Sequence, residues 1–117
     1  MQQQGITTLM AKLLDKTRLR RVDWESTASV AEYVTQLGTY ALSISMKKYG
    51  LVGNQIQPPD YSLKILNEGG EAIATITETR PHQSYYDALQ ETYEIASLVA
   101  SGLEAGLKAL IEGLDSL

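Results

Sequence analysis

The sequence predicts one α+β domain, built from a helix, a four-stranded antiparallel meander and a long C-terminal helix. Three observations lead to this fold class. Apolar residues recur at helical spacing near both ends of the chain, and the middle alternates apolar and polar residues with the two-residue period of a half-buried strand. Glycine and proline separate the alternating stretches. Because only one face of such a sheet is apolar, we expect both helices on that face, in a two-layer sandwich.

The composition suits a single domain over residues 1–117. The chain is 44% hydrophobic and 21% charged, which is ordinary for a globular protein and provides enough apolar residues for one core. Residues 95–103, the longest nearly uncharged stretch, are about half as long as the ~20 residues that cross a bilayer, so we expect no membrane span. The sequence has no cysteine, which fits a reducing compartment, and its first residues lack an export signal. We therefore expect a cytoplasmic protein.

The first expected helix covers residues 6–17. Its apolar residues fall on one helical face, as in an amphipathic helix that packs against a core. They are Ile6, Leu9, Met10, Leu13 and Leu14. Polar residues gather at positions 18–26, where we expect the helix to end.

The first two expected strands cover residues 29–37 and 39–47, with Gly38 between them. The second is the clearest strand in the chain, because its apolar residues alternate strictly with small or polar ones. The residues expected to face the core are Tyr40, Leu42, Ile44 and Met46.

The other two expected strands, residues 60–66 and 71–78, form a hairpin. The turn at residues 67–70 reads Asn-Glu-Gly-Gly, and glycine accepts the positive φ angles of tight turns. The core-facing residues of this pair are expected to be Tyr61, Leu63, Ile65, Ile73 and Ile76.

A connector at residues 49–60 joins the second strand to the third and contains two adjacent prolines, which do not donate to a sheet. We expect it to be an exposed loop. Its apolar residues Leu51, Val52 and Ile56 either dock a protein partner or cover an open sheet edge, and the sequence does not decide between these alternatives.

The last element is expected to be one long helix that begins near His82, with Ser84 and Asp87 forming its N-terminal cap. From Tyr86 to Leu117 apolar residues recur at alternating steps of three and four. At ~1.5 Å per residue such a helix rises about 50 Å, whereas strands of about six to eight residues span only ~20–27 Å. The second half of the helix therefore extends beyond the sheet.

That second half carries the candidate interaction surface. Its leucines are Leu103, Leu107, Leu110 and Leu114, and a strip of small residues beside them begins with Gly102 and Gly106. Exposure of such a row is unfavourable, because burying one leucine contributes roughly 1.5–3 kcal/mol. Glycine within a helix also costs ~1 kcal/mol relative to alanine, so these glycines need either a close contact or a break in the helix to explain them.

Three arrangements would cover the leucines. A second copy of the protein, the N-terminal helix of the same chain, and a helix broken at the glycines or a different protein partner all remain open. We expect the first, a homodimer in which residues 102–117 act as an oligomerisation element.

The charge distribution raises nucleic-acid binding as a further alternative. Residues 1–21 hold five basic side chains and one acidic side chain, and the segment Lys-Thr-Arg-Leu-Arg-Arg at residues 16–21 suits phosphate contacts. The rest of the chain is strongly acidic, however, and sequence-independent binding needs a continuous basic field. Nucleic acid is therefore an unlikely partner.

The residues that carry chemistry elsewhere do not form a recognisable catalytic or metal site. His82 is the only histidine, and the row of Asp87, Glu91 and Glu94 along one helical face is typical of a solvated surface. No nucleotide-phosphate or zinc-protease motif is present, so we expect no cofactor, no metal and no enzymatic activity.

The polar face of the predicted sheet offers a competing function, the binding of a small molecule or an anion. Its candidate residues are Ser43, Ser45, Lys47 and Lys64, which would gather around the ligand. The same residues are also ordinary on a hydrated sheet face.

Several short motifs resemble a set of small uncharacterised bacterial proteins. The motifs are Trp24-Glu25, the two Tyr-x-Leu-x-Ile stretches that begin at Tyr40 and Tyr61, and Leu89, Tyr93-Glu94 and Ala96. The resemblance covers residues 24–98. It implies a soluble bacterial α+β domain of unknown activity and assigns a function to no residue. Together, these observations predict a non-enzymatic protein-interaction or regulatory module that acts as a homodimer.

Overall fold

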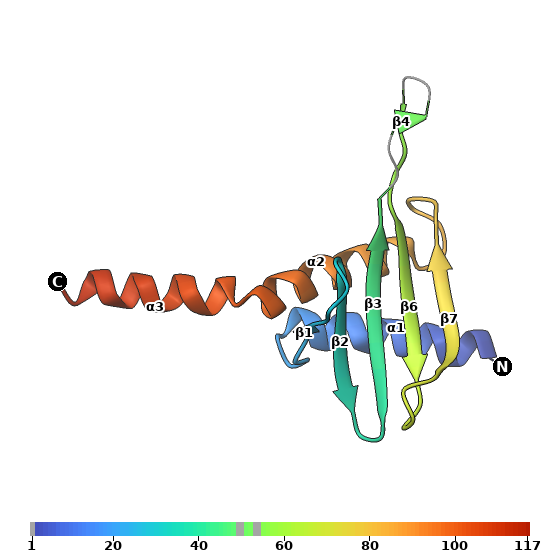
Figure 1. The fold of residues 1–117 in the computed structure, drawn as a ribbon, viewed down its shortest axis with the longest axis horizontal. Helices are drawn as coiled ribbons and strands as arrows, with labels where there is room; N and C mark the ends of the chain where they lie inside the picture. The colour runs from blue at the N-terminus through green and yellow to red at the C-terminus, as the bar shows by residue number, and fades with distance from the viewer. Residues whose placement is uncertain (1, 49–50, 53–54) are drawn as a thin grey trace.

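The computed structural model describes residues 2–48, 51–52 and 55–117, and the side chains of residues 4–48 and 57–117. Its elements are, in chain order, α1 (Gln2–Arg18), β1 (Glu25–Ser26), β2 (Glu32–Leu37), β3 (Tyr40–Lys47), β4 (Leu51–Val52), β5 (Gln55–Ile56), β6 (Asp60–Leu66), β7 (Ala72–Glu78), α2 (Tyr86–Ser101) and α3 (Leu103–Asp115). An antiparallel meander runs in the order β1-β2-β3-β6-β7, while β4 and β5 pair only with each other (Figure 1). The α+β class and the antiparallel sheet are confirmed.

The sheet has five strands where four were predicted. The additional strand, β1, is only two residues long, so it is too short for an alternation to reveal it. It pairs Glu25 with Val34 and Ser26 with Tyr33 at the edge of the sheet. The four predicted strands correspond to β2, β3, β6 and β7.

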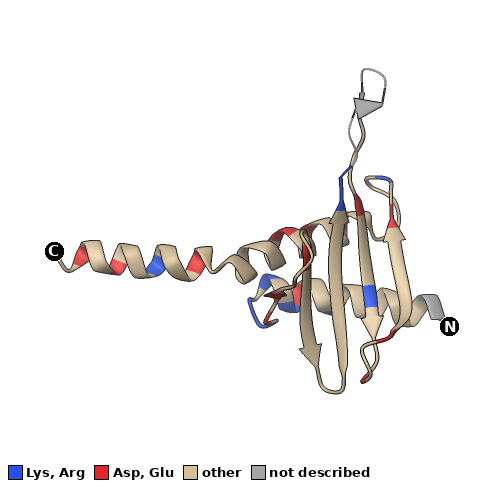
Figure 2. Ribbon diagram, in the orientation of Figure 1, with Lys and Arg blue, Asp and Glu red and all other residues tan. Residues whose placement is uncertain are grey.

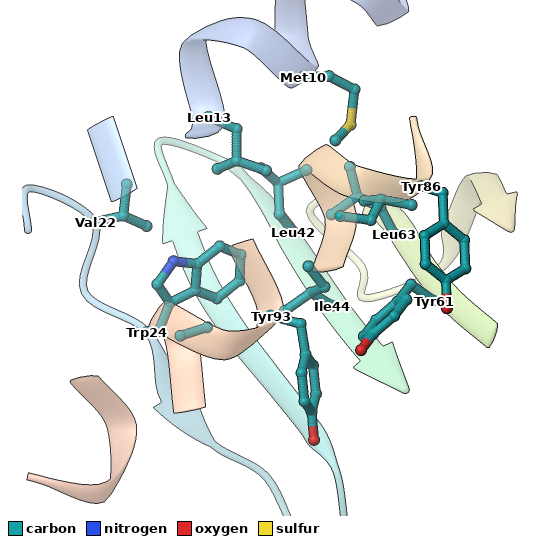
Figure 3. Packing of buried hydrophobic residues seen from close by; sticks show 12 residues of the cluster. Met10, Leu13, Val22, Trp24, Leu42, Ile44, Tyr61, Leu63, Tyr86 and Tyr93 are labelled. Carbon is teal, nitrogen blue, oxygen red and sulfur yellow. The ribbon is translucent and has the colours of Figure 1, made fainter. Parts of the chain in front are cut away.

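One face of the sheet and two helices enclose the hydrophobic core (Figure 3). Ile44 pairs with Tyr33 on one side and with Leu63 on the other, so residues of neighbouring strands form rows on this face. The helices contribute Met10 and Leu13 from α1, and Tyr86, Leu89, Tyr93 and Ala96 from α2. Both α1 and α2 therefore cover the same sheet face, as the single apolar face of the strands predicted.

Trp24 links α1 to the sheet. Its indole is buried in the core, and its Nε1 donates a hydrogen bond of 3.2 Å to the hydroxyl of Thr17, which is also buried. This bond pairs two polar groups that burial would otherwise leave unsatisfied. The end of α1 is thereby fixed against the start of the sheet.

Two residues predicted to face the core do not lie in it. Tyr40 shares the face of Leu42 but is 51% exposed, because it stands at the end of the β2–β3 hairpin, beyond the helices. Ile73 is exposed because the register between β6 and β7 shifts. Ile65 pairs with Ala74 and Leu66 with Ala72, so Ile73 is an additional residue in the ladder, as in a β-bulge.

The turn at residues 67–70 has the predicted form. Gly70 has a φ of +83° and donates its N–H to the carbonyl of Asn67 at 2.9 Å. The connector between β3 and β6, predicted to be an exposed loop, contains the two short strands β4 and β5, which pair with each other and extend past the sheet in Figure 1. The side chains of Leu51, Val52 and Ile56 lie outside the described part of the chain.

The prediction of one long C-terminal helix is wrong. The helix is divided at Gly102, which has a φ of +71°, into α2 and α3. The predicted cap is also wrong. Helix α2 begins at Tyr86, Ser84 has a positive φ, and Asp87 accepts the backbone N–H of His82 at 3.3 Å instead of capping α2. Within the described ranges, no helix is long and apolar enough to cross a membrane.

Candidate functional site

The most unusual surface of the molecule is helix α3, which continues from α2 away from the sheet (Figure 1). Gly102 ends α2 by donating its N–H to the carbonyl of Val99 at 3.2 Å, and its own carbonyl accepts the first bond of α3, from Gly106, at 2.9 Å. The hydroxyl of Ser101 accepts the N–H of Leu103 at 3.2 Å. The break is therefore one residue long, and α3 is continuous through Gly106.

The predicted leucines form an exposed row along α3. Leu103 and Leu107 are each 49% exposed, and Leu110 and Leu114 are 66% and 68% exposed. Ile111, which was not predicted to belong to this surface, widens the row and is also exposed. No residue of α3 is buried. We call these five side chains the α3 apolar face.

The N-terminal helix does not cover this face. Helix α1 packs beside α2, where the hydroxyls of Thr7 and Tyr85 lie 2.8 Å apart and Arg18 forms a bidentate ion pair with Glu91. Of the three carboxylates that the sequence placed on one face of α2, Glu91 thus forms an ion pair with an arginine of α1. Within one protomer, α1 therefore does not cover the leucines of α3, and this alternative is not the one that the structure adopts.

The glycines of α3 have no explanation within one protomer. A Cβ on Gly106 or Gly113 would meet no atom within 4 Å beyond the adjacent residues and backbone of its own helix, although glycine in the middle of a helix costs ~1 kcal/mol relative to alanine. Gly102 differs, because its left-handed backbone makes glycine the favoured residue there. Of the two predicted interface glycines, Gly102 therefore has a structural role, whereas Gly106 remains open to contact.

One ion pair joins the first turn of α3 to the end of α1. The guanidinium of Arg20 donates from Nε and Nη2 to the two carboxylate oxygens of Glu104, at 2.8 and 2.9 Å. Its Nη1 donates to the carbonyl of Arg18 at 3.0 Å, at the end of α1. Arg20 has a φ of +59°, in the left-handed position that usually takes glycine at a helix end. The side chain thus connects α1 to α3 across the break at Gly102.

Removal of the Arg20–Glu104 ion pair is expected to widen the range of orientations that α3 adopts relative to the sheet. The hydrogen bonds from Arg20 lower the pKa of Glu104 below its ordinary 4.5. Because the folded-state pKa is lowered, the pair is fully formed above pH 4.5 and is lost as the pH falls through the lowered pKa. Glu104→Gln removes the carboxylate charge and should therefore break the ion pair at neutral pH.

Spin labels on Thr39→Cys and Ala109→Cys, in a chain that otherwise has no cysteine, measure this direction. With labelled protein diluted into unlabelled chain, Glu104→Gln is expected to broaden the distance distribution, and Glu112→Gln on the same helix is expected to leave it unchanged. A narrow distribution in the Glu104→Gln variant would show that Gly102 alone sets the direction.

Half of the cations in the basic segment, residues 16–21, are engaged within the protein. Arg18 and Arg20 hold Glu91 and Glu104, so two of its four cations are neutralised by carboxylates. Lys16 and Arg21, together with Lys12, instead border a groove of about 220 Å³ beside α1. Figure 2 shows these charges around α1 and the acidic residues along α3. Among the side chains that the structure describes, the remaining cations of this segment do not form the continuous basic track that a phosphate backbone needs.

The polar face of the sheet is partly occupied by a carboxylate. The buried hydroxyl of Ser43 donates a hydrogen bond of 2.6 Å to Glu32, and both residues line a shallow hollow of about 300 Å³ with Lys64. Ser45 lies beside Glu32 and Ser62 on this face, and the hydroxyl of Ser62 is 2.9 Å from that of Thr77. The negative charge of Glu32 disfavours an anion at this position.

Another hollow, of about 530 Å³, lies at the other end of the sheet. It is lined by Tyr33, Tyr93 and Met46, and by Lys47 and Lys48. Burial raises the pKa of Tyr93 to about 12, so its hydroxyl stays neutral at physiological pH. The open, largely apolar wall of this hollow provides no acid and base paired for proton transfer.

Comparisons with protein-family models, curated proteins and solved structures give no match for this chain. The resemblance over residues 24–98 therefore remains a prediction.

Proposed function

We propose that this protein is a non-enzymatic interaction module that forms a homodimer through α3. The observation that carries the proposal is the exposure of every large side chain on the α3 apolar face. A contiguous exposed apolar patch of this kind is typical of a protein-binding surface. Our expectation of a cytoplasmic protein, which depends on composition, belongs to the same proposal.

The energetics favour association over a solvated α3. Full burial of one leucine or isoleucine contributes roughly 1.5–3 kcal/mol, and the α3 apolar face has five such side chains, each about half to two-thirds exposed. Gly106 and Gly113 add to this argument, because they permit another chain to approach the helix backbone closely. A second copy of the chain is the partner that is present wherever α3 is present.

Sedimentation equilibrium of the full chain tests the proposal. Between micromolar and millimolar concentrations the average mass is expected to rise from 12.9 kDa toward twice that value. The mass should rise because dimer formation is bimolecular and removes apolar surface from water. A mass of 12.9 kDa at all concentrations would overturn self-association.

A further inference from the structure

The groove beside α1 has the form of an empty helix-binding site. Its floor is apolar and combines Leu9 and Leu13 of α1 with Leu37 and Leu42 of the sheet. Leu37 lies on the sheet face that the helices cover and yet is 47% exposed. In Figure 1 the β2–β3 hairpin extends past α1, so this end of the sheet has no helix over it.

The groove and α2 lie on opposite flanks of α1. At about 100° per residue, Thr7 and Arg18, which contact α2, point away from Lys12 and Lys16, which border the groove. A helix in the groove would therefore lie next to α1 and on the same sheet face, as the third member of a layer that already contains α2 and α1.

The rim of the groove is strongly basic. Lys12, Lys16 and Arg21 border it, and in the described part of the chain none of the three forms an ion pair. These unpaired cations stand in a chain with an overall charge of -4. A partner for this groove must therefore combine an apolar face with acidic side chains.

Helix α3 has this combination. Its net charge is negative, from Glu104, Glu112 and Asp115 against one basic residue, Lys108. Glu104 and Asp115 lie along one flank of the apolar face, whereas Glu112 lies on the opposite side of the helix. Its 13 residues span ~20 Å, and the groove is bordered on α1 by Leu9 to Lys16, a stretch of ~12 Å, so about two turns of α3 would lie in it. Within its own protomer, however, α3 is held away from α1 by Gly102 and by the ion pair of Glu104 with Arg20. The groove that α3 reaches is that of another molecule.

We infer that α3 of each copy binds in the groove between α1 and the β2–β3 hairpin of the other copy, so that the dimer exchanges its C-terminal helices. This inference rests on the proposed homodimer and specifies its receiving surface. Direct pairing of two α3 helices is the competing arrangement. It places two helices of the same net negative charge together and leaves both grooves empty, whereas the exchange brings opposite charges together and covers both apolar surfaces.

Reversal of the charges on the groove tests the inference. The double variant Lys12→Glu/Lys16→Glu changes two exposed side chains, and it is expected to raise the dimer dissociation constant at least about tenfold at low salt. Lys48→Glu/Arg80→Glu is the matched control, with the same change in net charge at exposed positions outside the groove. Its dissociation constant is expected to stay within about twofold of the unmodified chain. Thermal unfolding verifies that both variants are folded.

A compensating pair makes the test specific. Glu112→Lys/Asp115→Lys should also weaken self-association, because a basic α3 then meets a basic groove. A mixture of this variant with Lys12→Glu/Lys16→Glu is expected to form heterodimers, since each α3 then faces a groove of opposite charge. If Lys12→Glu/Lys16→Glu alone dimerises as tightly as the unmodified chain, the groove is not the receiving surface and α3 pairs elsewhere. If the unmodified chain is monomeric, the proposed homodimer fails as well.

Discussion

The double variant Leu107→Asp/Leu110→Asp is expected to be a folded monomer at concentrations where the unmodified chain is a dimer. Leu107 is 49% and Leu110 66% exposed, and neither belongs to the hydrophobic core, so aspartate there leaves the core packing intact. In a dimer interface each aspartate would bury an unpaired carboxylate that has lost its contact with water, which is unfavourable. Loss of a central apolar anchor alone costs about 2 kcal/mol, so two replacements are expected to raise the dissociation constant more than ~100-fold.

Sedimentation equilibrium measures this loss, and circular dichroism follows the unfolding transition. The matched control is Ala105→Asp/Ser116→Asp, which adds the same charge to α3 at exposed positions on the side opposite the leucines. The control is expected to dimerise with a dissociation constant close to that of the unmodified chain, because its added charges lie away from the apolar face. A Leu107→Asp/Leu110→Asp variant that keeps the dimer mass would contradict association through the α3 apolar face.

Replacement of Trp24 by alanine is expected to lower the free energy of unfolding by ~3–5 kcal/mol. The indole is only 2% exposed and stands where α1, the sheet and α2 meet, so its removal leaves a cavity among well-packed side chains. The change also leaves the buried hydroxyl of Thr17 without the hydrogen bond that it accepts from Nε1. Loss of this size is a large part of the stability of a small domain.

Urea unfolding followed by circular dichroism measures the effect, because Trp24 is the only tryptophan and its fluorescence is lost in the variant. Trp24→Phe keeps an aromatic ring and removes the N–H, so it is expected to retain more of the stability than Trp24→Ala. If both variants lose the same amount, the hydrogen bond to Thr17 outweighs the packing of the ring. A loss below ~1 kcal/mol for Trp24→Ala would place the centre of the core elsewhere.

These two predictions separate two kinds of apolar side chain that look alike in the sequence. Leu63 and Leu89 are fully buried, whereas Leu110 and Leu114 are mostly exposed. The apolar residues of α2 and α3 have the same helical spacing on both sides of Gly102. This spacing indicates which side of the helix a residue faces and does not indicate whether another part of the protein covers that side. The length of the helix relative to the strands was the signal that distinguished them.

The fold class was predictable because it depends on local patterns, whereas the alignment of neighbouring strands does not. Alternation in β3 and β6 marks Leu42, Ile44, Tyr61 and Leu63 as core residues, since a two-residue period is a local property of a strand. The strand β1 and the bulge that exposes Ile73 depend on how neighbouring strands align, and no local pattern determines that alignment.

In the C-terminal region, the spacing of the leucines was enough to predict an amphipathic helix that extends past the end of the sheet. The position at which this helix divides became known from the folded structure. Glycine adopts both helical and left-handed backbone conformations, so the sequence does not distinguish Gly102 from Gly106. The capping bonds at Ser101 and the ion pair between Arg20 and Glu104 accompany the break at Gly102. The groove beside α1 was equally hidden, because its residues come from segments that are distant in the chain and meet only when the sheet and α1 have packed together.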